Sequence, residues 1–265
     1  MRISGRGGHS QDVRGAVGIV DEVSVNRVIT PRVFEYLKIA GCEVYDVTPE
    51  KSGTSEADLS IPVNKANQWQ ADYFFSVHLN SSRGLGHGCE VIYKSHAGKE
   101  YAEQIVSKLA ALGFINRGVK YDTRGLYEFN HCVMPNNIIE CFFCDNAEDI
   151  KIYNKIGCSN IAKAIAEGII GKEIVNTGIW LKGNDGFWYY YENGYKVKNT
   201  WRRDSKDWCY LNEKGEAIVN GWAQDSTKKW FFCGDDCRII RSQWIEWKGK
   251  QYYFNEDGAW DGKEK

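Results

Sequence analysis

The sequence predicts an α/β domain with a twisted, mostly parallel sheet flanked by helices, followed by an all-β solenoid of stacked hairpins. From Met1 to about residue 174, short β-rich runs alternate with segments of helical periodicity. After about residue 178 the helical periodicity disappears, and nine of the ten tryptophans of the 265-residue chain lie in this tail. We therefore expect two domains, residues 1–174 and 178–265.

The first domain has a series of short apolar runs, which we expect to form the strands of its sheet. These runs span residues 2–4, 43–47, 73–78, 89–93 and 137–141. Between them, apolar residues recur with the three-to-four-residue spacing of amphipathic helices in the stretches 25–37, 105–112 and 161–169. Strands that alternate with helices are typical of a parallel sheet covered by helices.

The tail contains an internal repeat of aromatic residues. Trp180, Trp201, Trp222 and Trp244 recur at spacings of 21, 21 and 22 residues, and each is followed by a second aromatic, in order Trp188, Trp208, Trp230 and Tyr252. Turn residues such as Asn193-Gly194 and Asp257-Gly258 follow the aromatic runs, which predicts a short hairpin in each unit. Because one hairpin cannot bury enough surface to be stable alone, we expect neighbouring hairpins to stack.

Charge and composition exclude several classes of partner. Lys and Arg number 34 against 35 Asp and Glu, and neither half has the basic surface that nucleic acid requires. The apolar runs fall short of the ~18 residues of a membrane span. Residues 1–8 lack the apolar region of a secretory signal, so we expect synthesis in the cytoplasm without a signal peptide. The nine scattered cysteines predict free thiols.

Four polar residues of the first domain lie where strands end or a helix begins: His9, Glu22, His78 and Glu140. In an open α/β sheet the carboxyl ends of the strands line the ligand crevice, so we expect these side chains to converge. Two imidazoles and one carboxylate form a catalytic zinc site with an open fourth position. A further carboxylate, Glu140, then serves as the base in the cleavage of an amide. The alternative is that these residues are unrelated core and surface positions.

Two other motifs have simpler interpretations. The segment Gly5-Arg6-Gly7-Gly8 follows a predicted strand but lacks the spacing of a dinucleotide-binding loop. Cys141 and Cys144 form a single C-x-x-C pair, which we interpret as packing thiols because buried cysteines are common and no second pair exists.

The order and spacing of several segments resemble the zinc-dependent N-acetylmuramoyl-L-alanine amidases, especially the phage and clostridial endolysins. The resemblance covers about residues 1–172 and implies that His9, Glu22 and His78 bind Zn²⁺ and that Glu140 is the catalytic carboxylate. It implies hydrolysis of the amide between N-acetylmuramic acid and L-alanine in peptidoglycan. The matching segments are Gly7-Gly8-His9-Ser10, Gly18-Ile19-Val20-Asp21-Glu22-Val23, residues 72–80, Asn116-Arg117-Gly118-Val119-Lys120 and residues 138–146.

The tail resembles the choline-binding repeats of cell-wall proteins, on units such as Gly221-Trp222 followed by Trp230-Phe231-Phe232. Aromatic faces that surround a quaternary ammonium attract it by cation–π interaction. The resemblance implies anchoring to the choline of teichoic acid, and related repeats in clostridial toxins resemble glucan binders, so another wall polymer stays open. The aromatics that the resemblance assigns to binding are Trp180, Trp188, Trp201, Trp208, Trp222, Trp230, Trp244 and Tyr252.

The sequence thus predicts a peptidoglycan hydrolase that acts at the bacterial wall after release from the cytoplasm. Two alternatives stay open: a zinc peptidase that cuts within the stem peptide, and a wall-binding protein without catalytic activity. The host, the oligomeric state and the distinction between phage lysin and autolysin are not predicted.

Overall fold

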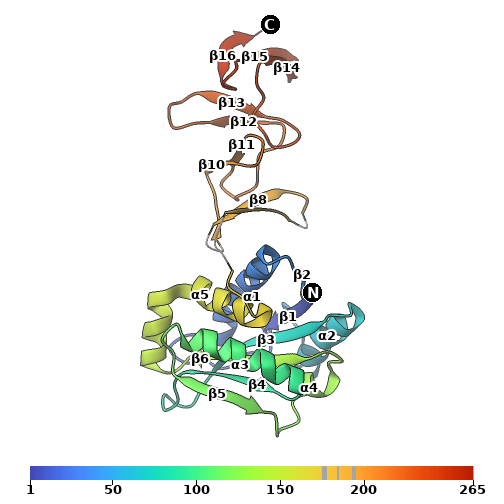
Figure 1. Cartoon of the computed structure of the whole chain (residues 1–265), viewed down its shortest axis with the longest axis vertical. Helices are drawn as coiled ribbons and strands as arrows, with labels where there is room; N and C mark the ends of the chain where they lie inside the picture. Colours follow the sequence, from blue (N-terminus) through green and yellow to red (C-terminus); the bar gives the residue numbers. More distant parts are fainter. Residues whose placement is uncertain (175–177, 184, 193–194, 265) are drawn as a thin grey trace. The chain divides into compact units, whose positions relative to one another are not determined.

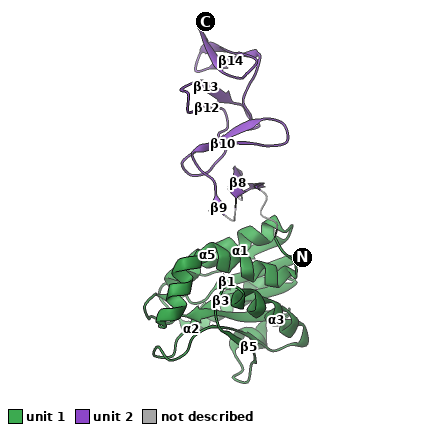
Figure 2. Cartoon of the chain, turned by 60° about the vertical axis from the view of Figure 1, so that its left-hand side comes forward, with its two compact units in different colours: residues 1–175 green, residues 176–265 purple. Residues whose placement is uncertain are grey.

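A computed structural model describes residues 1–174, 178–183, 185–192 and 195–264 (Figure 1). The chain divides into two compact units, Met1–Val175 and Asn176–Lys265, which are coloured separately in Figure 2. The predicted turn at Asn193 and Gly194 lies outside the described residues.

The first unit is built on a six-stranded sheet of order β2-β1-β3-β6-β4-β5. Neighbouring strands are parallel except β4 and β6, so the prediction of a mostly parallel sheet is confirmed. One strand, β5, was not predicted, because it lies at the edge of the sheet and lacks a buried apolar run. The strands are β1 Arg2–Gly7, β2 Glu43–Asp46, β3 Tyr73–Asn80, β4 Cys89–Tyr93, β5 Asn116–Tyr121 and β6 Asn136–Phe143.

Helices cover both faces of this sheet. One face packs against α1, α3 and α5, and the other packs against α2 and α4 (Figure 1). The short α4 and the polar α2, which contains Pro62, lack a long apolar stripe and were not predicted. The helices are α1 Glu22–Ile39, α2 Ser55–Gln68, α3 His96–Ala110, α4 Tyr127–His131 and α5 Ala147–Ile170.

Alternation along β3 determines which side chains reach the site. Tyr73, Phe75 and Val77 pack into the core beneath α1, α3 and α5, whereas Phe74 packs with Ala66 of α2. Since successive side chains in a strand point to opposite faces, His78 points to the same face as Phe74. One face of β3 therefore packs into the core beneath α1, α3 and α5, and its other face carries His78.

The second unit consists of small antiparallel sheets, as predicted for stacked hairpins. Isolated bridges join successive repeats, from Tyr189 to Glu216, Cys209 to Arg238 and Phe231 to Ala259. The strands are β7 Ile179–Lys182, β8 Trp188–Glu192, β9 Tyr195–Lys196, β10 Thr200–Arg203, β11 Trp208–Leu211, β12 Gly221–Gln224, β13 Trp230–Cys233, β14 Gln243–Trp247, β15 Lys250–Phe254 and β16 Trp260–Glu264.

All nine cysteines are free thiols, as predicted. Within the described ranges, no helix combines the length and the apolar character that a membrane crossing requires.

Candidate metal centre and active site

His9 reaches the site from the turn that follows β1. Its backbone is left-handed, with φ 59°, which turns the chain out of the strand. The preceding residue is glycine because the His78 ring lies against its backbone: a Cβ on Gly8 would lie 2.3 Å from Cε1 of His78. A larger residue at this position would displace the His78 ring.

Glu22 is the first residue of α1, directly after Asp21, whose side chain caps the helix by accepting the Ser24 N–H. The Glu22 side chain is only 2% exposed, yet its carboxylate is well supplied with donors. The backbone N–H of Ala16 donates to Oε2 at 2.7 Å, and that of Leu79 donates to Oε1 at 3.1 Å. A buried carboxylate held from two sides has a fixed orientation.

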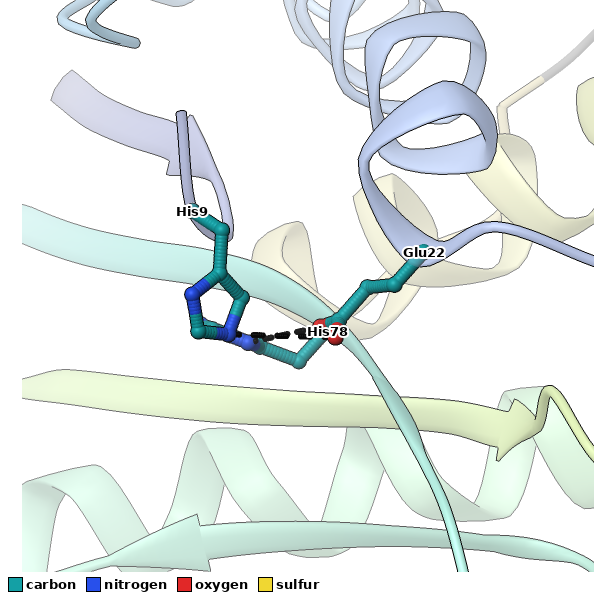
Figure 3. Close-up of side chains that lie close together, drawn as sticks. All are labelled: His9, Glu22 and His78. Carbon is teal, nitrogen blue, oxygen red and sulfur yellow. Dashed lines mark hydrogen bonds and ion pairs between the residues drawn. The ribbon is translucent and has the colours of Figure 1, made fainter. Parts of the chain in front are cut away.

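The side chains of His9, Glu22 and His78 point toward one another although they come from three separate elements (Figure 3). Nδ1 of His78 lies 2.9 Å from Oε1 of Glu22, and Nε2 of His9 lies 3.8 Å from Oε2. One ligand atom from each residue lies within 4.8 Å of the others. The structure thus brings these three predicted residues together.

The ionisation of the three groups reflects their contacts. Burial alone would raise the pKa of Glu22, but the hydrogen bond and charge of His78 hold that pKa at about 2. Burial would lower the pKa of His78, yet the hydrogen bond and charge of Glu22 raise it above its usual value. Burial and the charge of His78 lower the pKa of His9. Glu22 is therefore a carboxylate at neutral pH.

These three side chains fit a zinc ion. Two histidines and one glutamate are a ligand set of catalytic zinc, which binds nitrogen and oxygen at about 2.0–2.2 Å. Two ligand atoms of a tetrahedral zinc ion therefore lie about 3.3–3.5 Å from each other. The distance from Glu22 to His78, 2.9 Å, is slightly shorter than this, and the distance from Glu22 to His9, 3.8 Å, is slightly longer. Glu22 also compensates the positive charge that such an ion would bring into the site.

Glu140 lies on β6 next to this site. It is in register with His78 of β3 on one side and with Glu90 of β4 on the other. Its Oε2 is buried without a hydrogen-bond partner among the described residues. Burial raises the pKa of Glu140 to about 7; the charge of His78 lowers this pKa, and the charges of Glu22 and Glu90 raise it. A carboxyl group with this pKa accepts and releases a proton near neutral pH.

Glu90 is a neighbour of the site that sequence reasoning missed. Nδ2 of Asn80 donates to its Oε1 at 3.0 Å, and Nε of Arg117 donates to its Oε2 at 2.8 Å. Arg117 also lies over the ring of Phe143, 4.9 Å from its centroid. Alternation along 89–93, which points Glu90 away from the apolar positions Cys89 and Val91, was the available signal.

A buried ionic cluster behind the site was also missed. Arg6 of β1, 1% exposed, pairs with Asp58 of α2 at 2.7 Å and lies 3.9 Å from Glu128 of α4. Ser76 donates to the second oxygen of Glu128 at 2.7 Å. The charge of Glu128 contributes to the raised pKa of His78. No local sequence pattern predicts this cluster, because Arg6, Asp58 and Glu128 belong to three different elements.

The predicted binding aromatics of the tail fall into two groups. Trp188, Trp208 and Trp230, which open the second strand of successive hairpins, are 41%, 42% and 42% exposed, and Trp244 is 38% exposed. Trp180 and Trp201 pack on Tyr190 and Tyr210, each with ring centroids 5.1 Å apart. Trp222 contacts Tyr252 at 5.1 Å and lies within an aromatic cluster with Phe232, Phe254 and Trp260.

A cavity of about 420 Å³ in the tail is lined by residues of three successive repeats. Two of the predicted aromatics, Trp201 and Trp208, line it together with Phe231, which belongs to the next hairpin. Asp225, Asp257, Ile239 and Arg241 complete the lining. Arg241 donates from Nε and Nη2 to Asp207, at 2.7 and 2.8 Å, so its charge is neutralised.

The fold and the site define a class of protein. A mostly parallel sheet presents a candidate His/Glu/His metal site next to a carboxylate on the adjoining strand, a set of residues that suits metal-assisted hydrolysis. The chain belongs to the N-acetylmuramoyl-L-alanine amidase family, whose model matches residues 5–171.

Known proteins agree with this assignment. The catalytic domain of CD27L, an endolysin targeting Clostridia difficile, is 36% identical, with a TM-score of 0.62 over 66% of this chain and 99% of that domain. The catalytic domain of CwlV, an N-acetylmuramoyl-L-alanine amidase from Bacillus (Paenibacillus) polymyxa, is 26% identical, with a TM-score of 0.57 over 64% of this chain and 97% of that domain.

Relatives by sequence show the same family. The amidase LytC of Bacillus subtilis (strain 168) is 34% identical over 62% of this chain and 34% of its own length. An uncharacterised protein of Clostridium perfringens is 38% identical over 66% of this chain and 53% of its own. The match spans about half the length of this uncharacterised protein and of a second Clostridium perfringens relative.

The close approach of Gly8 to His78 predicts that Gly8→Ala weakens metal binding about tenfold or more. The added Cβ must push the His78 ring away from Glu22, and overpacking of this kind costs about 1–3 kcal/mol. Zinc affinity is measured by competition with a chromogenic chelator. Gly234→Ala is the control, because its φ is not left-handed and a Cβ there would meet no atom closer than 3.7 Å. Equal zinc affinity of the Gly8→Ala variant and the wild type would contradict this interpretation of the site.

Proposed function

We propose that the protein is a zinc-dependent N-acetylmuramoyl-L-alanine amidase that cleaves the amide between N-acetylmuramic acid and L-alanine in peptidoglycan. The convergence of His9, Glu22 and His78 within 4.8 Å supports the metal site. The family match over residues 5–171 supports the substrate and the scissile bond. The endolysin neighbour supports action at the bacterial cell wall.

His9, Glu22 and His78 would hold the zinc ion. When bound, zinc would act as a Lewis acid on the carbonyl of the scissile amide and acidify a water molecule. The chain orients the metal donors through its own contacts, since Ala16 and Leu79 fix the Glu22 carboxylate and Gly8 leaves room for His78. Because these donors are set before substrate binds, little reorganisation is needed at the moment of reaction.

Glu140 is the proposed general base. Its position in register with His78 places the carboxylate on the strand next to the metal site, and its Oε2 has no partner among the described residues. In this role Oε2 takes a proton from the attacking water and then delivers it to the amide nitrogen of the leaving L-alanine. Asn80 and Arg117 hold the neighbouring Glu90 carboxylate in place by hydrogen bonds to its two oxygens.

Glu140→Gln should reduce release of stem peptide about 10²- to 10⁴-fold, because the amide cannot accept the proton. Bound zinc, measured by atomic absorption, should stay equal to that of the wild type. Glu148→Gln, an exposed position on the first turn of α5, is the matched control and should retain activity. Full activity of the Glu140→Gln variant would show that the base is another group.

Two alternative activities are separated by the products and by chelation. Mass spectrometry of the amidase products should show whole stem peptides that begin with L-alanine, whereas a zinc peptidase would release fragments cut inside the stem. A wall-binding protein without catalysis would release neither. Exhaustive chelation should abolish release, and added zinc should restore it; activity that survives chelation would exclude the metal mechanism.

We also propose that the tail anchors the enzyme to a wall polymer through the cavity at Trp201, Trp208 and Phe231. Three aromatic side chains surround it, and the carboxylates of Asp225 and Asp257 give its lining a negative charge once Asp207 neutralises Arg241. Aromatic faces next to carboxylates favour a cation, and the choline of teichoic acid is the proposed ligand. Another wall glycan is the alternative, since Trp faces also stack on sugars.

Trp208→Ala should weaken wall binding about tenfold, and Trp188→Ala should not. Both residues open the second strand of a hairpin and are almost equally exposed, but Trp208 lines the cavity and Trp188 does not. Co-sedimentation with purified walls measures binding, while cleavage of soluble muramoyl-peptides should be unchanged in both variants. Retention on a quaternary-amine resin with elution by free choline indicates choline, and wall binding without resin retention indicates a glycan. An equal loss of wall binding in both variants would show that the cavity is not the binding site.

A further inference from the structure

The turn between β6 and α5, residues 144–146, binds a loop next to the site through one carboxylate. Oδ2 of Asp145 accepts hydrogen bonds from Ser81 Oγ at 2.8 Å, Ser82 N at 2.8 Å and Gly84 N at 3.1 Å. These donors belong to the 81–88 loop, which follows directly on β3, the strand of His78. A charged acceptor makes such hydrogen bonds stronger than neutral ones.

Two neighbours of Asp145 hold the same loop at further points. Nδ2 of Asn146 donates to the carbonyl of Gly84 at 3.2 Å. Asp149, which is buried, accepts the Gly88 N–H at 2.8 Å and the Phe143 N–H at 2.9 Å. The 81–88 loop is therefore hydrogen-bonded at several points to residues at the start of α5.

The same turn also binds the segment that leads into Glu22, residues 14–21. The carbonyl of Cys144 accepts the Ile19 N–H at 2.8 Å and the Val20 N–H at 3.2 Å. Gly18 packs on Asp145 so closely that a Cβ would lie 2.7 Å from Asp145 Cα. Within this segment, Ala16 donates to the Glu22 carboxylate. One turn thus contacts both chain segments that adjoin the metal residues.

Both segments expose apolar side chains. Val17 is 66% exposed, Ile19 57% and Leu85 86%. Val17 follows directly on Ala16, the donor to Glu22, and Leu85 lies within the fastened loop. Single exposed apolar residues need no explanation, but these three lie on two segments that are fixed to one turn beside the site. These three side chains, here called the apolar rim, are available for contact with a substrate.

We propose that Asp145 is a positioning residue of the amidase site: it fixes the 81–88 loop against the 14–21 segment, so that the rim of Val17, Ile19 and Leu85 meets the muramoyl-peptide in one arrangement. The proposal rests on the proposed function, because it assigns the rim to that substrate. Asp145 itself contacts neither substrate nor metal. It acts through the backbone of the loop, and its loss should release the loop while leaving the three metal donors in place.

The test is a graded series in the full chain with zinc bound: Ser81→Ala, Asp145→Asn and Asp145→Ala. Ser81→Ala removes one of the three donors, Asp145→Asn keeps one oxygen but loses the charge, and Asp145→Ala removes the acceptor. We expect kcat/KM for a soluble muramoyl-peptide to fall in this order and to reach about tenfold or more for Asp145→Ala, since small misplacements near a site cost up to ~10²-fold. Zinc content should not change.

A second readout does not depend on activity. Arg83 lies within the fastened loop, so trypsin cleavage after Arg83, followed by mass spectrometry, reports how often the loop opens. The rate of this cleavage should rise from Ser81→Ala through Asp145→Asn to Asp145→Ala, the order in which kcat/KM falls. Asp72→Ala is the control, because Asp72 likewise accepts a backbone N–H, that of Arg2 at 2.6 Å, but at the opposite end of β3.

The outcomes separate this proposal from the proposed function. Unchanged cleavage after Arg83 and unchanged kcat/KM in both Asp145 variants would overturn the positioning role. Faster cleavage with kcat/KM no lower than that of Asp72→Ala would also overturn it, because the loop would then be structural only. If Asp145→Ala fails to fold, the Asp145→Asn and Ser81→Ala variants still test the positioning role. Inactivity of the wild type toward every muramoyl-peptide would instead refute the amidase function, and the trypsin result would stand by itself.

Discussion

The buried carboxylate of Glu22 is the constraint on which the site depends. It lies at the first turn of α1, where the helix dipole favours a negative charge, and it accepts N–H groups from Ala16 and Leu79. Those two donors belong to the segment before α1 and to β3, so one side chain connects three parts of the fold. A charge that is 2% exposed is tolerated only when it is paired. The imidazole of His78, whose Nδ1 lies 2.9 Å from Oε1 of Glu22, meets this requirement.

The sequence predicted the centre of this arrangement because strand ends and side-chain alternation are local properties. His78 and Glu140 lie near the carboxyl ends of strands recognised from their apolar runs, and parallel register brings them side by side. Whatever depends on packing between distant segments was not predicted. Alternation places Glu90 on the right face of its strand, but its position next to Glu140 follows only from the sheet order. The Arg6–Asp58 pair and the hydrogen bonds of Asp145 to the 81–88 loop join segments that are far apart in the sequence.

The tail shows the same division between local and nonlocal information. A spacing of 21 or 22 residues was enough to predict hairpins, since each unit forms from its own aromatics and turn. It was not enough to say which aromatics share a cavity. Trp222 occupies a position equivalent to Trp201 in the repeat, yet Tyr252, Phe254 and Trp260 surround it, whereas Trp201 borders a cavity with Phe231. The difference lies in the following hairpin, not in the repeat itself.

The charges around the site are compatible with a bound cation. Asn80 and Arg117 compensate Glu90, and Glu140, with a pKa of about 7, is largely neutral below that pH. Glu22 remains charged, because its pKa is about 2. Metal binding requires neutral imidazoles, so His9 and His78 contribute no positive charge once they act as ligands. A cation at the point where the three side chains converge would compensate the Glu22 carboxylate, whose Oε1 lies against the His78 imidazole.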